Sequence, residues 1–257
     1  LNDYLAAFGG NIYYDVIDFI SNTKAPQNNA ILNLTNNELT VFGIPRIFIS
    51  DSQNVEILPT GNKIVLKKDR DFDFGGRVQA GLLTFYGNDF SFRYDSFRIH
   101  LNNIDSLNLA IIGDEVDIYG NRSIKKIRNN IQNITGDLLI DAPENKSGLK
   151  NIPQYPVFKS TTSAFVYYDV TEGIDSTIYP RDEFYYQLNP FEISDMTNLQ
   201  AEDLNLGGEY YCGDIFPVLK QNLSVNQDNS LGFVFEPPPE GIPTYGGKAT
   251  FYNQIIL

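Results

Sequence analysis

The chain has few of the side chains on which catalysis most often depends. Its 257 residues include one histidine, one cysteine and no tryptophan. Nucleophilic catalysis with an imidazole base needs a histidine, and His100 occupies an outward position in the middle of a predicted strand. A single cysteine, Cys212, excludes an internal disulfide and a multi-thiolate metal site, and no nearby cation or histidine stabilises its thiolate. We therefore expect no enzymatic activity and assign no catalytic residue.

Basic residues are also scarce, because 19 lysines and arginines stand against 32 acidic residues and leave a net charge of −13. A protein that binds nucleic acid needs cations to release counterions from phosphate, so we do not expect a nucleic-acid partner. The one basic cluster, formed by Lys125, Lys126 and Arg128, is interpreted as a solvated edge. No apolar run approaches the roughly 20 residues that a transmembrane helix requires.

What the chain has instead is alternation of apolar and polar residues, almost without pause over 72–101. Phe90, Phe92 and Tyr94 fall on one parity, and polar residues lie between them. A period of two places alternate side chains on opposite faces of a strand, so one face is buried and the other is wet. The pattern predicts an all-β, mainly antiparallel fold with little helix, built as an extended or stacked, solenoid-like sheet or as a sandwich.

Glycine and asparagine punctuate the chain at short intervals, as in Thr60-Gly-Asn62 and Tyr86-Gly-Asn-Asp89. Both residues tolerate positive φ, so we interpret these places as turns between strands. In 124–134, isoleucines recur at spacings of three and four, which is typical of a helix. Both a short helix and a strand therefore remain possible for this segment.

The segment 142–162 combines prolines, glycine and polar residues, and it is interpreted as an excursion or hinge. It separates β-rich segments 1–141 and 163–257, which we expect to be continuous with each other. Glu236-Pro-Pro-Pro-Glu240 is read as a stiff connector. The chain starts without methionine at Leu1 and stops within a predicted strand, so we expect it to be a fragment of a longer polypeptide.

Two acidic groups are candidate calcium sites. Asp69, Asp71 and Asp73 occupy alternate positions, as in the first part of a calcium loop. An EF-hand would then need glycine and glutamate where this chain has Phe74 and Ala80, so that loop is excluded. The second group spans Asp114 to Asp117. Solvated turns are the alternative for both groups, and we assign no metal and no cofactor.

Several longer stretches resemble an internal region of large, β-rich, uncharacterised cell-envelope proteins of Bacteroidota, over about 60–257. They are Arg70-Asp-Phe-Asp-Phe-Gly-Gly-Arg77, Phe85-Tyr-Gly-Asn-Asp-Phe90, Gly136-Asp-Leu-Leu-Ile-Asp-Ala-Pro-Glu-Asn-Lys-Ser-Gly-Leu149, Ser230-Leu-Gly-Phe233 and Tyr245-Gly-Gly-Lys-Ala-Thr-Phe-Tyr252. The resemblance implies a longer parent chain in the periplasm, outer membrane or cell surface of a Gram-negative bacterium. Asp105-Ser-Leu107 and Asp175-Ser-Thr177 are similar to the O-glycan attachment sites of such bacteria. The resemblance to these envelope proteins implies no activity and no functional residue.

The function expected from these features is that of a non-catalytic structural or partner-binding β module. Its partners would be other envelope proteins or the rest of its own parent chain. A lipid-holding β-groove and a carbohydrate-binding module are the alternatives, with lipid or glycan as the ligand. Adjacent strand residues face opposite ways, so one tyrosine of each Tyr-Tyr pair is expected to face outward. These pairs are Tyr13-Tyr14, Tyr167-Tyr168, Tyr185-Tyr186 and Tyr210-Tyr211.

Overall fold

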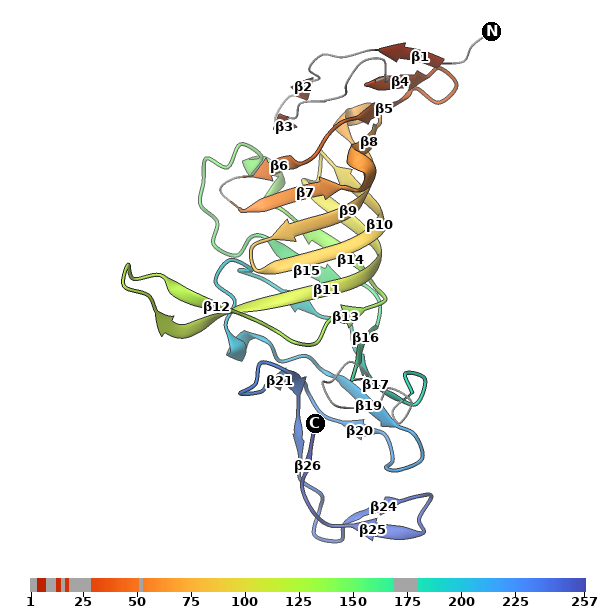
Figure 1. Ribbon diagram of the computed structural model, residues 1–257, viewed down its shortest axis with the longest axis vertical. Helices are drawn as coiled ribbons and strands as arrows, with labels where there is room; N and C mark the ends of the chain where they lie inside the picture. The colour runs from red at the N-terminus through yellow and green to blue at the C-terminus, as the bar shows by residue number, and fades with distance from the viewer. Residues whose placement is uncertain (1–3, 8–12, 15–16, 19–28, 51–52, 169–179) are drawn as a thin grey trace. The chain divides into compact units, whose positions relative to one another are not determined.

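A computed structural model describes residues 4–7, 13–14, 17–18, 29–50, 53–168 and 180–257. The fold is all-β and mainly antiparallel, as the sequence predicts (Figure 1). The chain forms two compact units, each made of segments that are separate in the sequence. Unit 1 contains Leu1–Leu107, Thr135–Ser160 and Glu192–Asn198, and unit 2 contains Asn108–Ile134, Thr161–Phe191 and Leu199–Leu257.

Helix is confined, within the described residues, to 3₁₀ turns of three residues each. They are η1 (Thr60–Asn62), η2 (Lys68–Arg70), η3 (Pro143–Asn145) and η4 (Ala201–Asp203). None of the helical segments in these ranges has the length and apolar character that a membrane span requires. The helix considered for 124–134 does not form, because Ile124, Ile131 and Ile134 belong to three different strands and Asn133, at φ 56°, turns the backbone between the last two.

Unit 1 contains the N-terminal strands and three strands from later in the chain. Its strands are β1 (Tyr4–Ala7), β2 (Tyr13–Tyr14), β3 (Ile17–Asp18), β4 (Ala30–Asn33), β5 (Glu38–Phe42), β6 (Ile47–Ser50), β7 (Val55–Pro59), β8 (Lys63–Leu66), β9 (Phe72–Ala80), β10 (Leu83–Arg93), the first part of β11 (Arg98–Val116), most of β14 (Ile134–Leu139), β15 (Val157–Ser160) and β18 (Glu192–Ile193). Antiparallel pairing joins β4 to β5, β5 to β8, β8 to β9, and β9 to β10, while β6 and β7 lie between β5 and β8 in the sequence. The result is a meander.

Neighbouring strands of this meander bend at the same level. Gly61 lies between β7 and β8 at φ 65°, and Gly76 within β9 has φ 136°. Gly87 in β10 pairs with Gly76 and begins a bulge, and Asn103 in β11 has φ 49°. A Cβ on Gly87 would lie 2.9 Å from the carbonyl oxygen of Asn103, so these two bends are also adjacent. We call Gly61, Gly76, Gly87 and Asn103 the kink row.

The kink row corrects the interpretation of two predicted turns. The segment 60–62 is a bend between β7 and β8, which run in the same direction, and 86–89 lies inside β10. The hairpin turn between β9 and β10 is instead at Gly81 and Leu82. Positive φ serves a bulge as well as it serves a hairpin, so glycine and asparagine alone do not distinguish the two.

The core of unit 1 is formed by the inward parity of these strands. Phe72 and Phe92 stack at 4.9 Å between ring centroids, and both rings are fully buried. Phe85 of β10 also lies 4.9 Å from Phe158 of β15, although β11 and β14 separate these two strands in the sheet. Such a contact is impossible in a flat sheet. The sheet of unit 1 therefore curls with its apolar face inward.

The segment 142–162, predicted as an excursion, is one only up to 156, because 157–160 form β15 in the sheet; its start is attached to the strands of unit 1 by a buried carboxylate. Asp141 is 1 % exposed, and it accepts hydrogen bonds from Gln53 Nε2 at 2.9 Å and from Asn145 Nδ2 at 2.8 Å. The backbone amide of Ala142 donates to its other oxygen at 2.7 Å. Asn145 in turn bonds both backbone groups of Lys150. Because a buried carboxylate is tolerated only when it is hydrogen-bonded, this cluster fixes the start of the excursion.

Unit 2 is built from shorter strands around a smaller core. It contains the end of β11, β12 (Arg122–Lys126), β13 (Ile131–Gln132), β16 (Ala164–Tyr167), β17 (Phe184–Leu188), β19 (Gly208–Cys212), β20 (Leu219–Lys220), β21 (Ser224–Val225), β22 (Leu231–Gly232), β23 (Val234–Phe235), β24 (Ile242–Thr244), β25 (Ala249–Phe251) and β26 (Ile255–Ile256). Its central ladder runs β13, β16, β17, β19, β20 in antiparallel order.

Replacement of Gly76 by alanine should destabilise the protein far more than replacement of Gly61. A Cβ on Gly76 would lie 2.3 Å from the carbonyl oxygen of Leu58, whereas a Cβ on Gly61 meets nothing within 4 Å. We expect G76A to lower the free energy of unfolding by about 2–4 kcal/mol, from clash and strain together. G61A should lose about 1–2 kcal/mol, because its φ alone is strained. Urea unfolding measures both losses. Equal losses would contradict the close approach of the Leu58 carbonyl oxygen to Gly76.

Candidate functional site

Three tyrosines on adjacent strands of unit 2 form a row on the outward face. Tyr167 of β16 pairs directly with Tyr185 of β17, and Tyr185 pairs directly with Tyr211 of β19. All three side chains are partly exposed. Aromatic residues favour strands, and cross-strand neighbours stabilise one another, so the local sequence agrees with this arrangement. We call Tyr167, Tyr185 and Tyr211 the tyrosine ladder.

Polar groups border the tyrosine ladder. The hydroxyl of Tyr211 donates to Glu209 Oε2 at 2.9 Å, and Lys220 Nζ lies 2.8 Å from Glu209 Oε1. Lys220 and then Tyr211 hold the pKa of the Glu209 carboxyl below its usual value. At the other end of the row, the Arg181 guanidinium lies 4.7 Å from the ring centroid of Tyr167. The ladder therefore has an anionic side chain at one end and a cation at the other.

The tyrosine ladder contains one stacked pair of rings. Tyr185 and Tyr211 are nearly parallel, with an interplanar angle of 15° and centroids 4.7 Å apart. Two rings this close cannot lie side by side in one plane, so each covers a face of the other. A sugar ring stacks on an exposed aromatic face, and here the inner faces are already occupied. The surface suits hydrogen bonding more than flat stacking.

The other member of each described pair, Tyr168, Tyr186 or Tyr210, faces the interior. Tyr186 is fully buried, and its hydroxyl donates to the carbonyl oxygens of Leu206, at 3.3 Å, and Gln221. The hydroxyl of Tyr168 donates to the carbonyl oxygen of Leu231 at 3.2 Å. Tyr210 packs edge-on against Phe233 at 5.5 Å. The expected division of each pair is therefore found at three pairs, and the side chains of Tyr13 and Tyr14 lie outside the described residues.

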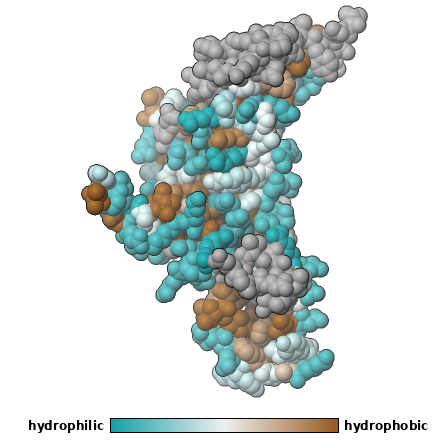
Figure 2. Space-filling view, viewed as in Figure 1, coloured by the Kyte–Doolittle hydropathy of each residue, from teal (hydrophilic) through white to brown (hydrophobic). Residues whose placement is uncertain are grey.

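A second surface of unit 2 was not expected from the sequence. The end of β11 and the start of β12 form a hairpin in which every residue from 114 to 122 is exposed. Four large apolar side chains stand in the solvent: Ile118 at 91 %, Tyr119 at 82 %, Ile124 at 64 % and Val116 at 58 % exposure. Figure 2 shows hydrophobic atoms at the end of this hairpin, which Figure 1 labels β12. We call these four residues the hairpin tip.

The turn at the hairpin tip is held by one carboxylate. Asp117 Oδ1 accepts hydrogen bonds from the backbone amides of Tyr119 and Asn121, both at 2.8 Å, and the Asn121 side chain bonds its other oxygen. These bonds, the Asn121 side chain foremost, lower the pKa of Asp117. Glu115 lies 4.0 Å from Lys125 across the hairpin. In the second candidate calcium group, Asp117 therefore stabilises the turn and Glu115 contacts the opposite strand.

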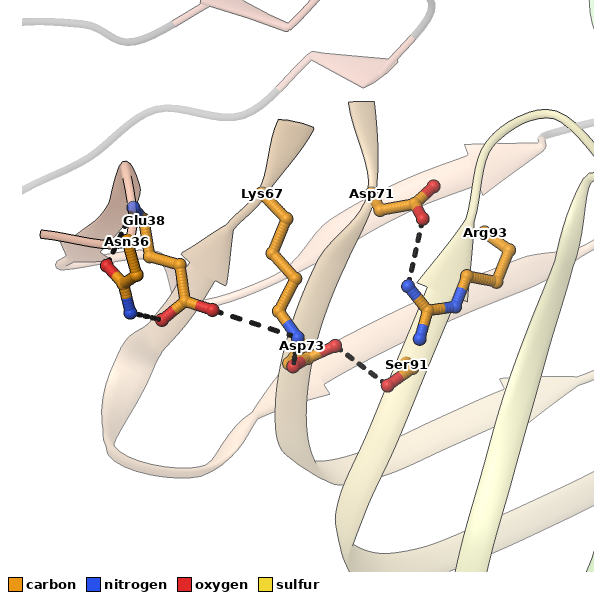
Figure 3. A network of polar contacts seen from close by, with 7 residues as sticks. All are labelled: Asn36, Glu38, Lys67, Asp71, Asp73, Ser91 and Arg93. Atoms are coloured by element: carbon orange, nitrogen blue, oxygen red, sulfur yellow. Dashed lines mark hydrogen bonds and ion pairs between the residues drawn. The ribbon is translucent and has the colours of Figure 1, made fainter. Parts of the chain in front are cut away.

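Two carboxylates of the first candidate calcium group, Asp71 and Asp73, belong to a network of polar contacts on unit 1, shown in Figure 3, whereas Asp69 lies in η2 at φ 62°. Arg93 Nη1 lies 2.9 Å from Asp71, while Lys67 and the hydroxyl of Ser91 both contact Asp73. Strand alternation places the two carboxylates on the same outward face, where each meets a cation rather than the other carboxylate. In the part of the chain that the structure describes, no three acidic, histidine or cysteine side chains gather as metal ligands would.

The remaining residues singled out in the sequence have structural surroundings. His100 Nδ1 contacts Asp137 on the neighbouring strand, and Arg98 lies 3.7 Å from the same carboxylate. Cys212 is buried, and burial raises the pKa of its thiol, which disfavours the nucleophilic thiolate. Arg128 of the basic cluster lies 3.0 Å from Asp228. Asp175-Ser-Thr177 lies outside the described residues.

The two tyrosines at 185 and 186 offer a matched test of the division between faces. We expect Tyr186→Phe to lower the free energy of unfolding by about 1–2 kcal/mol, because it removes the hydroxyl donor to the Gln221 carbonyl oxygen and one of the two donors to the Leu206 carbonyl oxygen, which keeps the backbone amide of Leu223. Tyr185→Phe should change it by less than about 0.5 kcal/mol, because that hydroxyl is on the outward face. Thermal or urea unfolding of both variants measures the difference. Equal effects would contradict the assignment of faces.

The buried tyrosines also predict how stability depends on pH. Desolvation raises the pKa of Tyr168 and of Tyr186 far above the usual tyrosine value. Above about pH 10 the unfolded chain releases protons that the folded chain keeps, so stability falls as pH rises. Each such tyrosine contributes up to about 1.4 kcal/mol per pH unit. Urea unfolding between pH 9 and 11.5 should therefore show a shallower decline for Tyr186→Phe; parallel curves would refute the burial of an ionisable phenol.

Comparison with known proteins adds no family to this description. No family model matches the chain, and neither a curated protein nor a solved structure matches it. Function is therefore inferred from the chain's own residues and their geometry.

Proposed function

We propose that this chain is a non-catalytic, protein-binding β module of a large cell-envelope protein, and that the hairpin tip is its docking element. The observation that carries this proposal is the exposure of four large apolar side chains on one free hairpin. Soluble domains rarely leave large apolar groups together in water, and where they do, a binding surface is the usual reason. The setting in the envelope rests on the resemblance of the longer motifs.

The chemistry around the hairpin tip favours a protein as the partner. Acidic residues, Asp114 and Glu115, and basic residues, Arg122 and Lys125, flank the apolar side chains within a few positions. An apolar centre with a charged rim of both signs is the usual composition of a protein interface. A surface that binds anionic membrane would instead have an excess of cations, which this acidic chain does not supply. Partners are other envelope proteins or the remaining parts of the parent chain.

The lipid-holding alternative has less support. A groove for acyl chains needs an apolar lining that stays unfilled, and the curled sheet of unit 1 provides the lining. Its inward positions, however, are filled by rings in mutual contact, such as Phe72 with Phe92 and Phe74 with Phe90 at 5.7 Å. Side chains that pack against one another leave little room for a lipid at these positions.

Glycan binding is the second candidate, and the tyrosine ladder is the observation that favours it. Three outward tyrosines with a neighbouring carboxylate provide hydroxyl and carboxylate groups for sugar hydroxyls. The stacking of Tyr185 on Tyr211 weakens this candidate, because one face of each of these rings is covered by the other and is closed to a sugar. Binding to a glycan array that is lost in Tyr167→Ala and Tyr211→Ala variants would move the proposal to this face.

The docking role can be tested with a photo-crosslinking amino acid in the cells that produce the protein. Placed at Tyr119, the crosslinker should give a discrete adduct with one protein partner. Placed at Leu149, which is 89 % exposed but lies in unit 1, it should give none. Ile118→Asp should abolish the Tyr119 adduct while changing the free energy of unfolding by less than about 0.5 kcal/mol, because Ile118 is exposed. No adduct at Tyr119, or the same adducts from both positions, would refute the proposal.

A further inference from the structure

An open pocket of about 300 Å³ lies on the outward side of unit 1, beside the kink row. Its volume is at the lower end of the roughly 300–1,000 Å³ that small-ligand sites occupy, so it suits one small molecule or one unit of a chain. The side chains that line it come from β7 to β11 and are Leu58, Thr60, Arg77, Tyr86, Asn88 and Asp105. None of them belongs to the hairpin tip.

Two glycines line the pocket where the strands bend, and a Cβ on either would meet backbone atoms or the Phe90 ring. Gly76 and Gly87 are cross-strand partners, and both line the hollow. Gly76 is required by the close approach of the Leu58 carbonyl oxygen and by its φ of 136°, so the strand cannot fill the space with a larger residue. The bend that curls the sheet therefore also leaves a permanent depression on the outward face.

Arg77 is the unusual side chain in this depression. It is half-buried, it forms no ion pair among the described residues, and its Nε is buried without an acceptor there. Arg93 and Arg98, in contrast, each lie beside an aspartate, although the Nε of Arg98 is likewise buried without an acceptor among the described residues. A planar guanidinium left in this way is suited to a carboxylate, which it can bind with two parallel hydrogen bonds.

The other polar groups of the pocket suit hydroxyls. Asp105 accepts a long 3.4 Å hydrogen bond from Asn88 Nδ2, which is its one side-chain hydrogen bond within the described part of the chain, and so it keeps acceptor capacity. Asn88 and Thr60 add donors and acceptors, and Leu58 and the ring of Tyr86 add apolar surface. A ligand that matches this set carries one negative charge, several hydroxyl groups and a face of C–H bonds. Phosphate does not match, because Asp105 would repel its second charge.

We propose that the pocket binds a carboxylated sugar unit, a hexuronic acid either free or within a glycan. Arg77 binds the carboxylate, Asp105 and Asn88 bind ring hydroxyls, and Tyr86 with Leu58 contacts the C–H face. This assignment uses residues of unit 1 only, so it stands or falls independently of the hairpin tip and its protein partner.

Amide NMR of the whole 257-residue chain tests the site, with glucuronate, glucose and inorganic phosphate as probes. Glucuronate should shift the amides of Gly76 and Gly87 in a saturable manner, and it should bind at least about tenfold more tightly than either other probe. Arg77→Gln should weaken glucuronate binding by about tenfold or more, and Asp105→Asn by less. Arg122→Gln, which removes an exposed arginine in unit 2, should leave binding unchanged.

A second comparison separates a built site from simple charge attraction. Arg77→Lys keeps the charge but loses the paired hydrogen bonds, so we expect it to bind glucuronate several-fold more weakly than the unaltered chain. A glucuronate oligosaccharide should shift the same glycine amides if the natural ligand is a glycan. No saturable shift, unchanged binding by Arg77→Gln, or phosphate binding as tight as glucuronate would each overturn the proposal.

Discussion

The structure of unit 1 depends on one requirement, that the apolar face of a long meander be removed from water. A flat sheet would leave that face exposed, and the described residues contain only 3₁₀ turns of three residues, which are too short to cover it. The kink row solves this by bending adjacent strands at one level, so the apolar face covers itself. The contact of Phe85 with Phe158 is the direct result. Burial of the apolar face of unit 1 therefore depends on backbone conformation. A bend in one strand curls the sheet only if the neighbouring strands bend at the same level.

Much of this architecture could be predicted from the sequence, because strand periodicity is a local signal. The alternation around Phe90 and Phe92 gave the correct inward parity, and the tyrosine pairs divided as expected. What glycine and asparagine would do was not predictable, since Gly61 and Gly87 form bends although their sequences are typical of turns. A bend differs from a turn only in the direction of the next strand, and that depends on pairing partners distant in the sequence.

The candidate surfaces were less predictable than the fold. The hairpin tip lies at the end of β11, where β12 is the strand that pairs with it. A short sequence pattern does not show which strands will pair with a given segment. The runs of acidic residues nearby drew attention to calcium, whereas Asp117 serves the turn itself. The pocket depends on the register of several strands, which brings Arg77 and Asp105 together from different hairpins. Of these surfaces, only the tyrosine ladder could be predicted from the sequence. Each of its tyrosines is next to a second tyrosine in the sequence, and alternation along a strand turns one of the two outward.

The kink row also has a consequence for how such a protein can change over evolutionary time. Each bend is matched only by the strands directly beside it, as Gly76 is matched by Pro59 and Gly87. Duplication of one hairpin together with its own pair of bends would therefore lengthen the array without disturbing what is already folded. A hairpin copied without its bends would interrupt the kink row of the neighbouring strands. Selection should therefore retain or lose these glycines as a set.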